Sequence, residues 1–399
     1  MPTMPRSIYL RPIATRVLVL STMVAAVSTS LPAQATDLPT DQSITISTGE
    51  TSKPDQYIMG EHEHSYHGNT PAGVHGGELM DAGKFAFSYT PMFMHMSDNY
   101  IGSSTVSPQT IVTTIPSQIK MNGMPEMYRV VPTSMDVQSH MFNFMYGVTD
   151  DLNLMVMASY QTKSMNMTTF SGAKGSAILG SSSASTSGVG DTAISSLWRI
   201  YKDPTHDVNL NLGLSLPTGS TTQNISMLSP MLSAMNMPMN MTMRASYGMQ
   251  LGTGTYDLLP GLTFTSHASN WSWGAAWRSR LPLDNNSEGY RYGDLNELTG
   301  WGGYTASPGV TWSARITESI QGSIHGSDPM ISGLMEGTNP NFYGGKHTDL
   351  LGGVEIAGMP FGYKNKHLAF EVGKTVLQDL NGPQLGSSWI FNVALGMEF

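Results

Sequence analysis

The sequence contains no cysteine and few charged residues, and each absence excludes a class of protein. Without cysteine, the fold cannot rely on disulfide bonds, and thiolate catalysis and cysteine-based metal sites are excluded. Charged residues make up 12% of the chain, which is about half of the roughly 25% found in average globular domains. Small polar residues take their place, as expected for strands that face lipid on one side and a lumen on the other.

The sequence also lacks the features of a nucleic-acid-binding protein or an enzyme. With 29 acidic and 20 basic residues, the net charge is −9 at pH 7, which argues against nucleic acid as a partner. Gly252-Thr253-Gly254 is not followed by a helical pattern, so the dinucleotide-binding fingerprint is not met. Ser139 and His140 are adjacent on a predicted strand and point to opposite faces, so they cannot form a catalytic dyad. We therefore predict no enzyme activity, no catalytic residues and no required cofactor.

The N-terminal part has the features of an export signal. Three arginines and no acidic residue precede an apolar run at 17–27, and the small-residue cleavage pattern Ala33-Gln34-Ala35 follows. We expect residues 1–35 to be a cleaved signal peptide. The run is too short to span a membrane, and no other run approaches about 18 apolar residues, so no transmembrane helix is predicted. A membrane-embedded form of this chain must then be a closed barrel.

The last segment alternates strictly between two kinds of residue. Apolar side chains occupy every second position from Trp389 to Phe399, and more polar or smaller residues such as Asn392 and Glu398 fall between them. A period of two predicts a β-strand with two different faces. An outward face that ends in aromatic side chains is typical of an outer-membrane β-barrel. The alternative for this segment alone is the last strand of a soluble β-sandwich.

Similar alternation recurs along most of the chain and predicts an all-β protein. We expect residues 83–399 to form a transmembrane antiparallel β-barrel of about 12 strands, each close to the length that a tilted membrane-spanning strand needs. Residues 36–82 are polar without a sustained period and are interpreted as a histidine-containing periplasmic leader. The expected strands are 83–96, 135–148, 152–163, 190–203, 206–217, 255–267, 270–282, 289–304, 307–320, 346–359, 366–378 and 387–399.

The connections between these strands fall into two sets, which gives an independent test. Barrels of the bacterial outer membrane have short periplasmic turns and longer external loops. The sequence therefore predicts this location, with outer-membrane lipid as a partner. The expected periplasmic turns, all short, are 149–151, 204–205, 268–269, 305–306 and 360–365. The expected external loops, four of them long, are 97–134, 164–189, 218–254, 283–288, 321–345 and 379–386.

Six short segments, in an order and spacing that fit most of the mature chain, resemble one known family. The chain is similar to bacterial outer-membrane transporters assigned to the phenol meta-cleavage pathway. This resemblance implies an exported outer-membrane barrel, but it supplies neither a substrate nor catalytic residues. The segments that carry it are Ala82–Tyr89, Val148–Leu152, Gly188–Asp191, Leu216–Gly219, Gln250–Asp257 and Leu380–Leu385.

Methionine is the outlier of the composition, with 30 residues. Thioethers are soft, neutral donors that favour Cu(I), and by the same softness Ag(I), over hard ions. Alternatively, methionine is a flexible apolar filler or forms an adaptable surface for apolar substrates, or its frequency is only compositional drift. The candidate ligands are Met235, Met237, Met239, Met241 and Met243 in the predicted external loop 218–254, and Met92, Met94 and Met96 in the first strand.

The leader contains a second candidate metal site. His62, His64 and His67 lie close together with two glutamates between them, and imidazole and carboxylate ligands suit Cu(II), Zn(II) or Ni(II). The spacing matches no known zinc signature, and a solvated polar leader is the equally weighted alternative. Together, the two kinds of cluster would place metal contacts on both sides of the barrel.

From the sequence, we expect a channel or transporter for small solutes. Solutes would diffuse passively through a lumen that is narrow or gated, because about 12 strands enclose less space than a general porin. Loops 97–134 and 218–254 are long enough to fold inward. The alternative is a barrel that binds Cu(I) or Ag(I) at the cell surface or handles copper through its methionine-rich loops. A third interpretation is a structural or adhesion barrel without transport.

Overall fold

The computed structural model describes residues 70–74, 76–121, 123–230, 239–363 and 365–399. The chain divides into two units, Met1–Glu63 and His64–Phe399, and all described residues belong to the second. The predicted signal peptide and residues 36–69 of the predicted leader lie outside the described residues.

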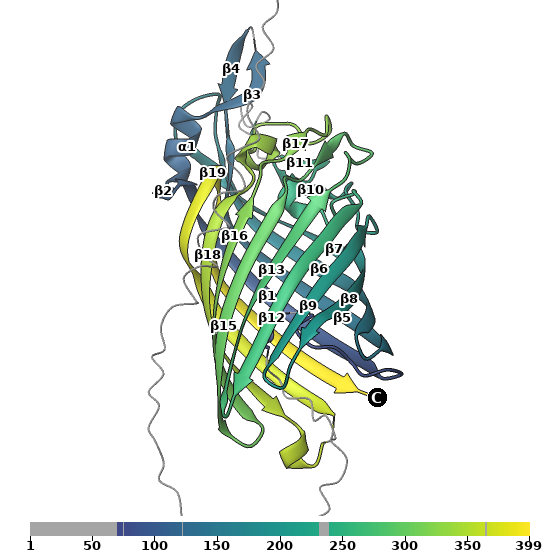
Figure 1. The fold of residues 1–399 in the computed structure, drawn as a ribbon. Coiled ribbons are helices and arrows are strands. Elements are labelled where there is room, and N and C mark those ends of the chain that lie inside the picture. The colour runs from purple at the N-terminus through teal and green to yellow at the C-terminus, as the bar shows by residue number, and fades with distance from the viewer. Residues whose placement is uncertain (1–69, 75, 122, 231–238, 364) are drawn as a thin grey trace, which may run out of the picture. The chain divides into compact units, whose positions relative to one another are not determined.

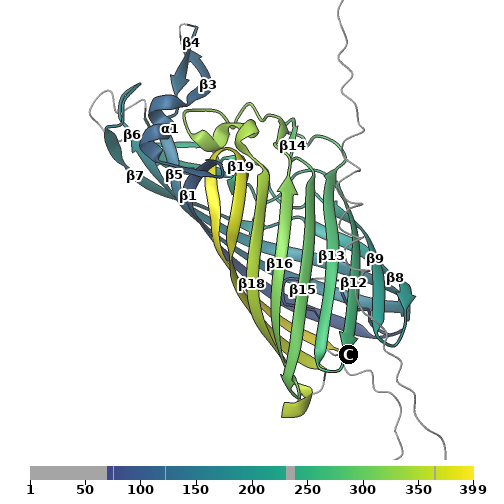
Figure 2. The ribbon, with the colours of Figure 1, turned by 60° about the vertical axis from the view of Figure 1, so that its left-hand side comes forward.

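Within the described residues, eleven antiparallel strands close into a barrel (Figures 1 and 2). Each strand pairs with its neighbours in the ring, and the last closes on the first because β19 pairs with β1. The protein is therefore an all-β closed antiparallel barrel, as the alternation predicts. In ring order the strands are β1 (Phe85–Gly102), β5 (Val130–Thr149), β6 (Leu152–Phe170), β8 (Thr192–Lys202), β9 (His206–Leu216), β12 (Asp257–Ala268), β13 (Trp271–Pro282), β15 (Leu295–Ser307), β16 (Val310–Gln321), β18 (Gly345–Ala357) and β19 (Lys366–Glu398).

Two places in the ring depart from a simple succession of single strands. Strand β19 pairs with β18 through residues 367–380 and with β1 through residues 380–398, and both pairings are antiparallel. The two expected strands 366–378 and 387–399 thus fall within one continuous element. Strand β7 (Ile178–Val189) extends the line of β8 along β6, with a break at Gly190 and Asp191. The expected number of about 12 strands is not confirmed by this count of elements.

The connections are sorted by length between the two ends of the barrel, as predicted. We call the end with the turns 150–151, 203–205, 269–270, 308–309 and 358–365 the short-turn end, and the opposite end the long-loop end. A 3-10 helix, η7 (Met359–Phe361), lies in the last of these turns. The long-loop end carries β2 (Ser104–Val106), α1 (Pro108–Thr114), β3 (Pro116–Met121), β4 (Met124–Met127), β10 (Asn224–Leu228), β11 (Asn240–Arg244), η4 (Tyr247–Met249), β14 (Tyr290–Arg291), β17 (His325–Gly326), η5 (Glu336–Thr338) and η6 (Pro340–Phe342).

The helices are all short. Among the described residues, none of them has both the length and the apolar character that crossing a membrane requires.

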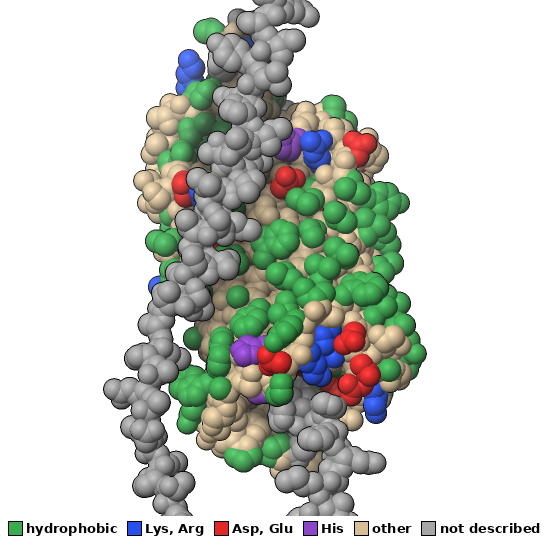
Figure 3. Space-filling model, in the orientation of Figure 1, with side chains coloured by type: hydrophobic (Ala, Val, Ile, Leu, Met, Phe, Trp, Pro, Cys, Tyr) green, Lys and Arg blue, Asp and Glu red, His purple; other side chains and the backbone are tan. Residues whose placement is uncertain are grey.

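Side chains of the barrel strands alternate between the lumen and the outer surface. On β12, Leu262 is 41% exposed whereas its neighbour Thr263 is 4% exposed. On β1, Phe85 is 55% exposed and Thr90 is 2% exposed, so this strand also has two different faces. Figure 3 shows the result as a band of apolar side chains between two zones where charged side chains gather. Such a band is the surface that an outer-membrane barrel presents to lipid.

Aromatic side chains mark the border of this band near the short-turn end. Trp271, Tyr304 and Trp312 are direct neighbours on three adjacent strands, and all three are exposed. The rings of Trp271 and Tyr304 lie 4.8 Å apart. This row suits the aromatic girdle of a membrane interface. Trp301 differs, because it is only 5% exposed and packs inside the barrel against Val74.

Candidate functional site: two pockets in the barrel lumen

Residues 70–74 and 76–80, which we call the luminal segment, lie inside the barrel before β1 begins. The backbone N–H of Gly73 donates to the carboxylate of Glu371 on β19 at 3.1 Å. The side-chain amide of Asn209 on β9 donates to the carbonyl oxygen of Gly77 at 3.2 Å. Val74 packs against side chains of β13 and β15. Because these strands belong to different parts of the ring, the segment reaches across the lumen.

A buried ion pair anchors this segment. Arg315 on β16 donates two hydrogen bonds to Glu371, of 2.7 and 2.8 Å. With the backbone N–H of Gly73 and the side-chain amide of Asn392, each at 3.1 Å, the carboxylate receives four hydrogen bonds, so it is well paired although it is only 1% exposed. A Cβ atom at Gly73 would collide with the Arg315 guanidinium and crowd the Glu371 carboxylate. A larger residue at this point would therefore require the ion pair or the segment to shift.

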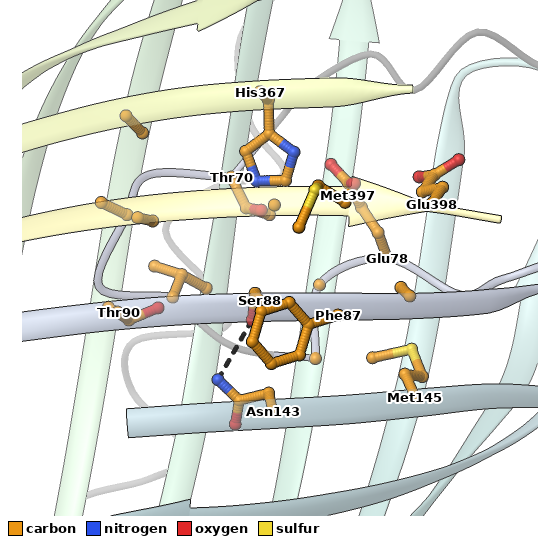
Figure 4. A pocket seen from close by; sticks show the side chains of 18 of the residues that line it. Thr70, Glu78, Phe87, Ser88, Thr90, Asn143, Met145, His367, Met397 and Glu398 are labelled. Atoms are coloured by element: carbon orange, nitrogen blue, oxygen red, sulfur yellow. Dashed lines mark hydrogen bonds between the residues drawn. The ribbon is translucent and has the colours of Figure 1, made fainter. Parts of the chain in front are cut away.

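One cavity, which we call the turn-side pocket, lies between the luminal segment and the barrel wall (Figure 4). Its volume is about 110 Å³, and Thr70 and Glu78 line it from the luminal segment. On the opposite wall, the side-chain amide of Asn143 donates to the hydroxyl of Ser88 at 3.1 Å. His367 also lines this pocket, yet among the described residues no three His, Asp or Glu side chains are placed to hold a metal ion.

A second cavity, the loop-side pocket, has a volume of about 350 Å³ and lies near the long-loop end. Its walls are inward-facing side chains of β1, β5, β6 and β19, and residues of the long connections contribute to its lining. Most of the side chains from the barrel wall are apolar, whereas ionisable or phenolic groups come from three residues. The apolar wall includes Met92, Met96, Met135, Val137, Met165 and Leu385, and the three others are Lys163, Glu336 and Tyr343.

A methionine-rich core continues from this pocket toward the long-loop end. Met135 and Met165 belong to it together with four further buried methionines from β6 and the long connections, and Met96 and Met243 pack against it. These residues come from segments far apart in the sequence, so their gathering depends on the barrel register and on the folded connections. The four further methionines are Met167, Met227, Met249 and Met335.

Hydrogen bonds hold the described part of loop 218–254 against the inner wall. The ammonium of Lys163 on β6 donates to the carbonyl oxygens of Gly248 at 3.0 Å and Gln250 at 2.5 Å. The hydroxyl of Thr186 on β7 donates to the carbonyl oxygen of Met249 at 2.7 Å. This loop therefore folds inward, as predicted.

Two other connections at the long-loop end differ from the sequence-based expectation. The connection between β16 and β18 supplies Glu336, Phe342 and Tyr343 to the loop-side pocket. The sequence did not predict that this connection folds inward. The described residues between 103 and 129 do not line the pocket. Helix α1 in that stretch instead packs into a separate cluster with Tyr128 and Phe170.

Glu336 is electrostatically unusual among the residues that line the loop-side pocket. Its side chain is 1% exposed, and within the described residues neither carboxylate oxygen has a hydrogen-bond partner. Burial raises the pKa of this carboxyl well above its usual range, because a charged carboxylate is poorly stabilised away from water. The same cause raises the pKa of Tyr343, and it raises the pKa of Tyr128 to about 12.

The structure places the predicted metal ligands in different surroundings. Met92 and Met96 line the loop-side pocket, and Met94 lies between them on the same face of β1. Met243 packs against the methionine core, whereas Met239 and Met241 are 49% and 36% exposed. Metal binding by any of these residues stays a prediction. Met235, Met237, His62, His64 and His67 lie outside the described residues.

Sequence reasoning missed four residues of the loop-side pocket. Met135 and Lys163 lie in the expected strands 135–148 and 152–163, whereas Met165 falls in the expected external loop 164–189. No sequence pattern showed that β1, β5 and β6 would place these residues side by side. Glu336 lies in a connection without periodicity, so nothing in the sequence indicated that it is buried.

The comparisons with known proteins support the fold. No family model matches the chain, and no curated protein matches it. The crystal structure of the COG4313 outer membrane channel from Pseudomonas putida F1 is 13% identical, with a TM-score of 0.50 over 82% of this chain and 99% of that chain. The Ralstonia pickettii toluene transporter TbuX is 12% identical (TM-score 0.38, covering 80% and 90%). A Pseudomonas aeruginosa FadL homologue is 9% identical (TM-score 0.36, covering 79% and 90%).

The first of these structures shares the barrel fold with this chain. Within the described residues, the ring of eleven strands closes on itself, and its outer surface carries an apolar band with an aromatic row at one border. Both features are what a hydrocarbon layer demands of a β-protein. This protein is therefore a β-barrel of the bacterial outer membrane.

Proposed function

We propose that this protein is a channel that passes small, largely apolar solutes across the outer membrane by passive diffusion. The observation that carries the proposal is the loop-side pocket, a mostly apolar cavity of about 350 Å³ inside the barrel. Binding sites for small molecules are typically apolar cavities of about 300–1,000 Å³ with a few polar groups. The Pseudomonas putida protein that shares this fold is an outer membrane channel, which is consistent with this role.

We infer that passage through the lumen is gated at two levels. We call Gly248, Phe342 and Tyr343, which line the loop-side pocket from the long connections, the cover. The luminal segment lies on the opposite side of the pocket, toward the short-turn end. A solute must displace or pass both to cross. The long-loop end faces the exterior in this proposal, because outer-membrane barrels keep their short turns in the periplasm.

The number of membrane crossings belongs to the same proposal. The stretches 367–380 and 380–398 of β19 pair antiparallel with β18 and β1, which run in opposite directions. We infer that the two stretches cross the membrane separately, which gives 12 crossings in the barrel. An even number agrees with the resemblance to outer-membrane transporters of the phenol meta-cleavage pathway, and membership of that family is part of this proposal.

Catalysis has no part in the proposed function. Ser139 lines the loop-side pocket, whereas His140 is joined to Tyr89 by a 2.7 Å hydrogen bond between Nδ1 and the hydroxyl. As expected for neighbours on a strand, the two side chains point to opposite faces. The pocket therefore lacks the serine–histidine pair that would suggest a hydrolase.

Uptake by intact cells tests the proposal, because the lipopolysaccharide leaflet slows apolar solutes that cross an ordinary bilayer freely. Gram-negative cells that produce the protein should take up radiolabelled benzene faster than cells without it. Ser139→Phe should fill the pocket and abolish the difference. Val148→Phe, on the exposed face of the same strand, should leave uptake unchanged. Equal uptake with and without the protein would disprove the proposal for this solute class.

A further inference from the structure

Three methionines form a direct row across three neighbouring strands inside the barrel. In the strand register, Met96 of β1 is the partner of Met135 of β5, and Met135 is the partner of Met165 of β6. Directly opposed residues on neighbouring strands have Cβ atoms about 4.5–5.5 Å apart. All three residues line the loop-side pocket. We call them the methionine ladder.

A fourth thioether belongs to the same cavity. Met92 lies four residues before Met96 on the same face of β1 and also lines the pocket. The methionine side chain has three rotatable bonds and a polarizable sulfur. The three ladder side chains are direct neighbours in the register, so this flexibility lets their sulfur atoms approach a common point. Met92 lies about 13 Å along β1 from Met96 at about 3.3 Å per strand residue, so it lines the cavity but does not share one ion with the ladder.

The pocket also contains a group that favours a cation. Glu336 is 1% exposed, and neither of its carboxylate oxygens has a hydrogen-bond partner within the described residues. Burying a cation is unfavourable unless it is paired, and the Glu336 carboxyl can release its proton to solvent and pair with the cation as a carboxylate. Lys163 also lines the pocket and opposes a second positive charge, although its ammonium is held by two backbone carbonyl groups.

We propose that the methionine ladder forms a binding site for a soft monovalent cation, Cu(I) or Ag(I), with Glu336 as the balancing charge. Several neutral thioethers without cysteine or clustered histidine suit these ions and disfavour Zn(II) or Mg(II). This site is internal, and it uses Met135 and Met165, which lie outside the methionine-rich loop segment 235–243. It does not depend on the channel function.

Silver binding to the refolded full-length protein tests this site. Ag(I), supplied as silver nitrate in buffer free of chloride and thiols, avoids the redox chemistry of Cu(I). The triple variant Met96→Leu/Met135→Leu/Met165→Leu keeps the volume and apolar character of the core, and such exchanges usually disturb packing little. The matched control is Met239→Leu/Met241→Leu, which changes two exposed methionines outside the barrel wall.

The expected result is the loss of one tightly bound silver equivalent in the ladder variant. The control should retain that equivalent, Glu336→Gln should bind it more weakly, and excess Zn(II) should not displace it. Equal silver stoichiometry and affinity in the wild type and the ladder variant would overturn the proposal. Where the triple variant does not refold, the single leucine variants serve instead, and unchanged affinity in all three would overturn it equally.

Discussion

Arg315 and Glu371 form a two-point ion pair inside the barrel, and the same carboxylate receives the backbone N–H of Gly73. The buried carboxylate of Glu371 thus joins β16 and β19 to the luminal segment. A buried carboxylate is stable only when donors pair with its oxygen atoms. The Arg315–Glu371 ion pair and the position of the luminal segment therefore depend on each other.

Removing only one partner of this pair should destabilise the protein strongly. Arg315→Met leaves the Glu371 carboxylate buried without its cation, and such changes typically cost about 3–5 kcal/mol. The double variant Arg315→Met/Glu371→Met should recover much of this loss, because no uncompensated charge remains. Denaturant unfolding in detergent micelles measures both. A loss below about 1 kcal/mol in the single variant would show that the pair does not hold the lumen together.

The stability of the cover over the loop-side pocket should decrease as the pH rises. Burial raises the folded-state pKa of Glu336 above its usual value of 4.5, so the folded state holds this proton more tightly than the unfolded state does. The unfolding free energy is then highest near and below pH 4.5 and falls as the pH rises through the raised pKa. Glu336→Gln removes this dependence.

Hydrogen exchange of residues 335–343 at several pH values measures this effect. Protection in the wild type should fall as the pH rises above 4.5, relative to Glu336→Gln. The exposed carboxylate of Glu318 on β16 supplies the control variant Glu318→Gln, which should behave like the wild type. Identical pH profiles in the wild type and Glu336→Gln would show that Glu336 does not make the stability of the cover depend on pH.

A charge on the outer surface should be tolerated poorly. Leu262 lies near the middle of β12 and is 41% exposed, so it faces lipid. Leu262→Arg should destabilise the folded barrel by about 2–4 kcal/mol, the usual effect of arginine near the bilayer midplane. Leu262→Met should be nearly neutral. Unfolding from phospholipid vesicles measures the difference, and an arginine variant as stable as the wild type would mean that this surface does not contact lipid.

The N-terminus of the exported protein should be Thr36. The basic start, the apolar run 17–27 and Ala33-Gln34-Ala35 together predict cleavage after Ala35. Mass spectrometry of protein purified from the outer membrane gives this directly. A mature protein that retains residues 1–35 would refute the signal-peptide prediction.

The barrel was predictable because every strand of its wall meets two different environments. Where lipid and lumen alternate along a strand, so do the residue types, as in Phe142, Asn143 and Phe144 on β5. The connection lengths then fix which strand ends lie together. The strand boundaries were less predictable, because β5 and β6 extend beyond the expected ranges 135–148 and 152–163.

The contents of the lumen were not predictable in the same way. The luminal segment has no period, and its position depends on single contacts such as that between Gly73 and Glu371. The loop-side pocket depends on the strand register, which aligns Met96 with Met135, and on a connection that brings Glu336 to the pocket. Composition showed that methionine is abundant, but only the register showed which methionines meet.

Planar-bilayer conductance of the full-length protein and of Gly73→Val tests the central claim, that this barrel is a channel obstructed by its own luminal segment. A valine side chain at position 73 forces either the Arg315–Glu371 ion pair or the segment to shift, and the account predicts that the segment leaves its place because the ion pair is held by more hydrogen bonds. Gly302→Ala, where a Cβ meets only an ordinary contact, is the control. The account predicts small, infrequent openings in the wild type and the control, and larger, lasting openings in Gly73→Val. A folded Gly73→Val barrel that conducts no more than the wild type would contradict it.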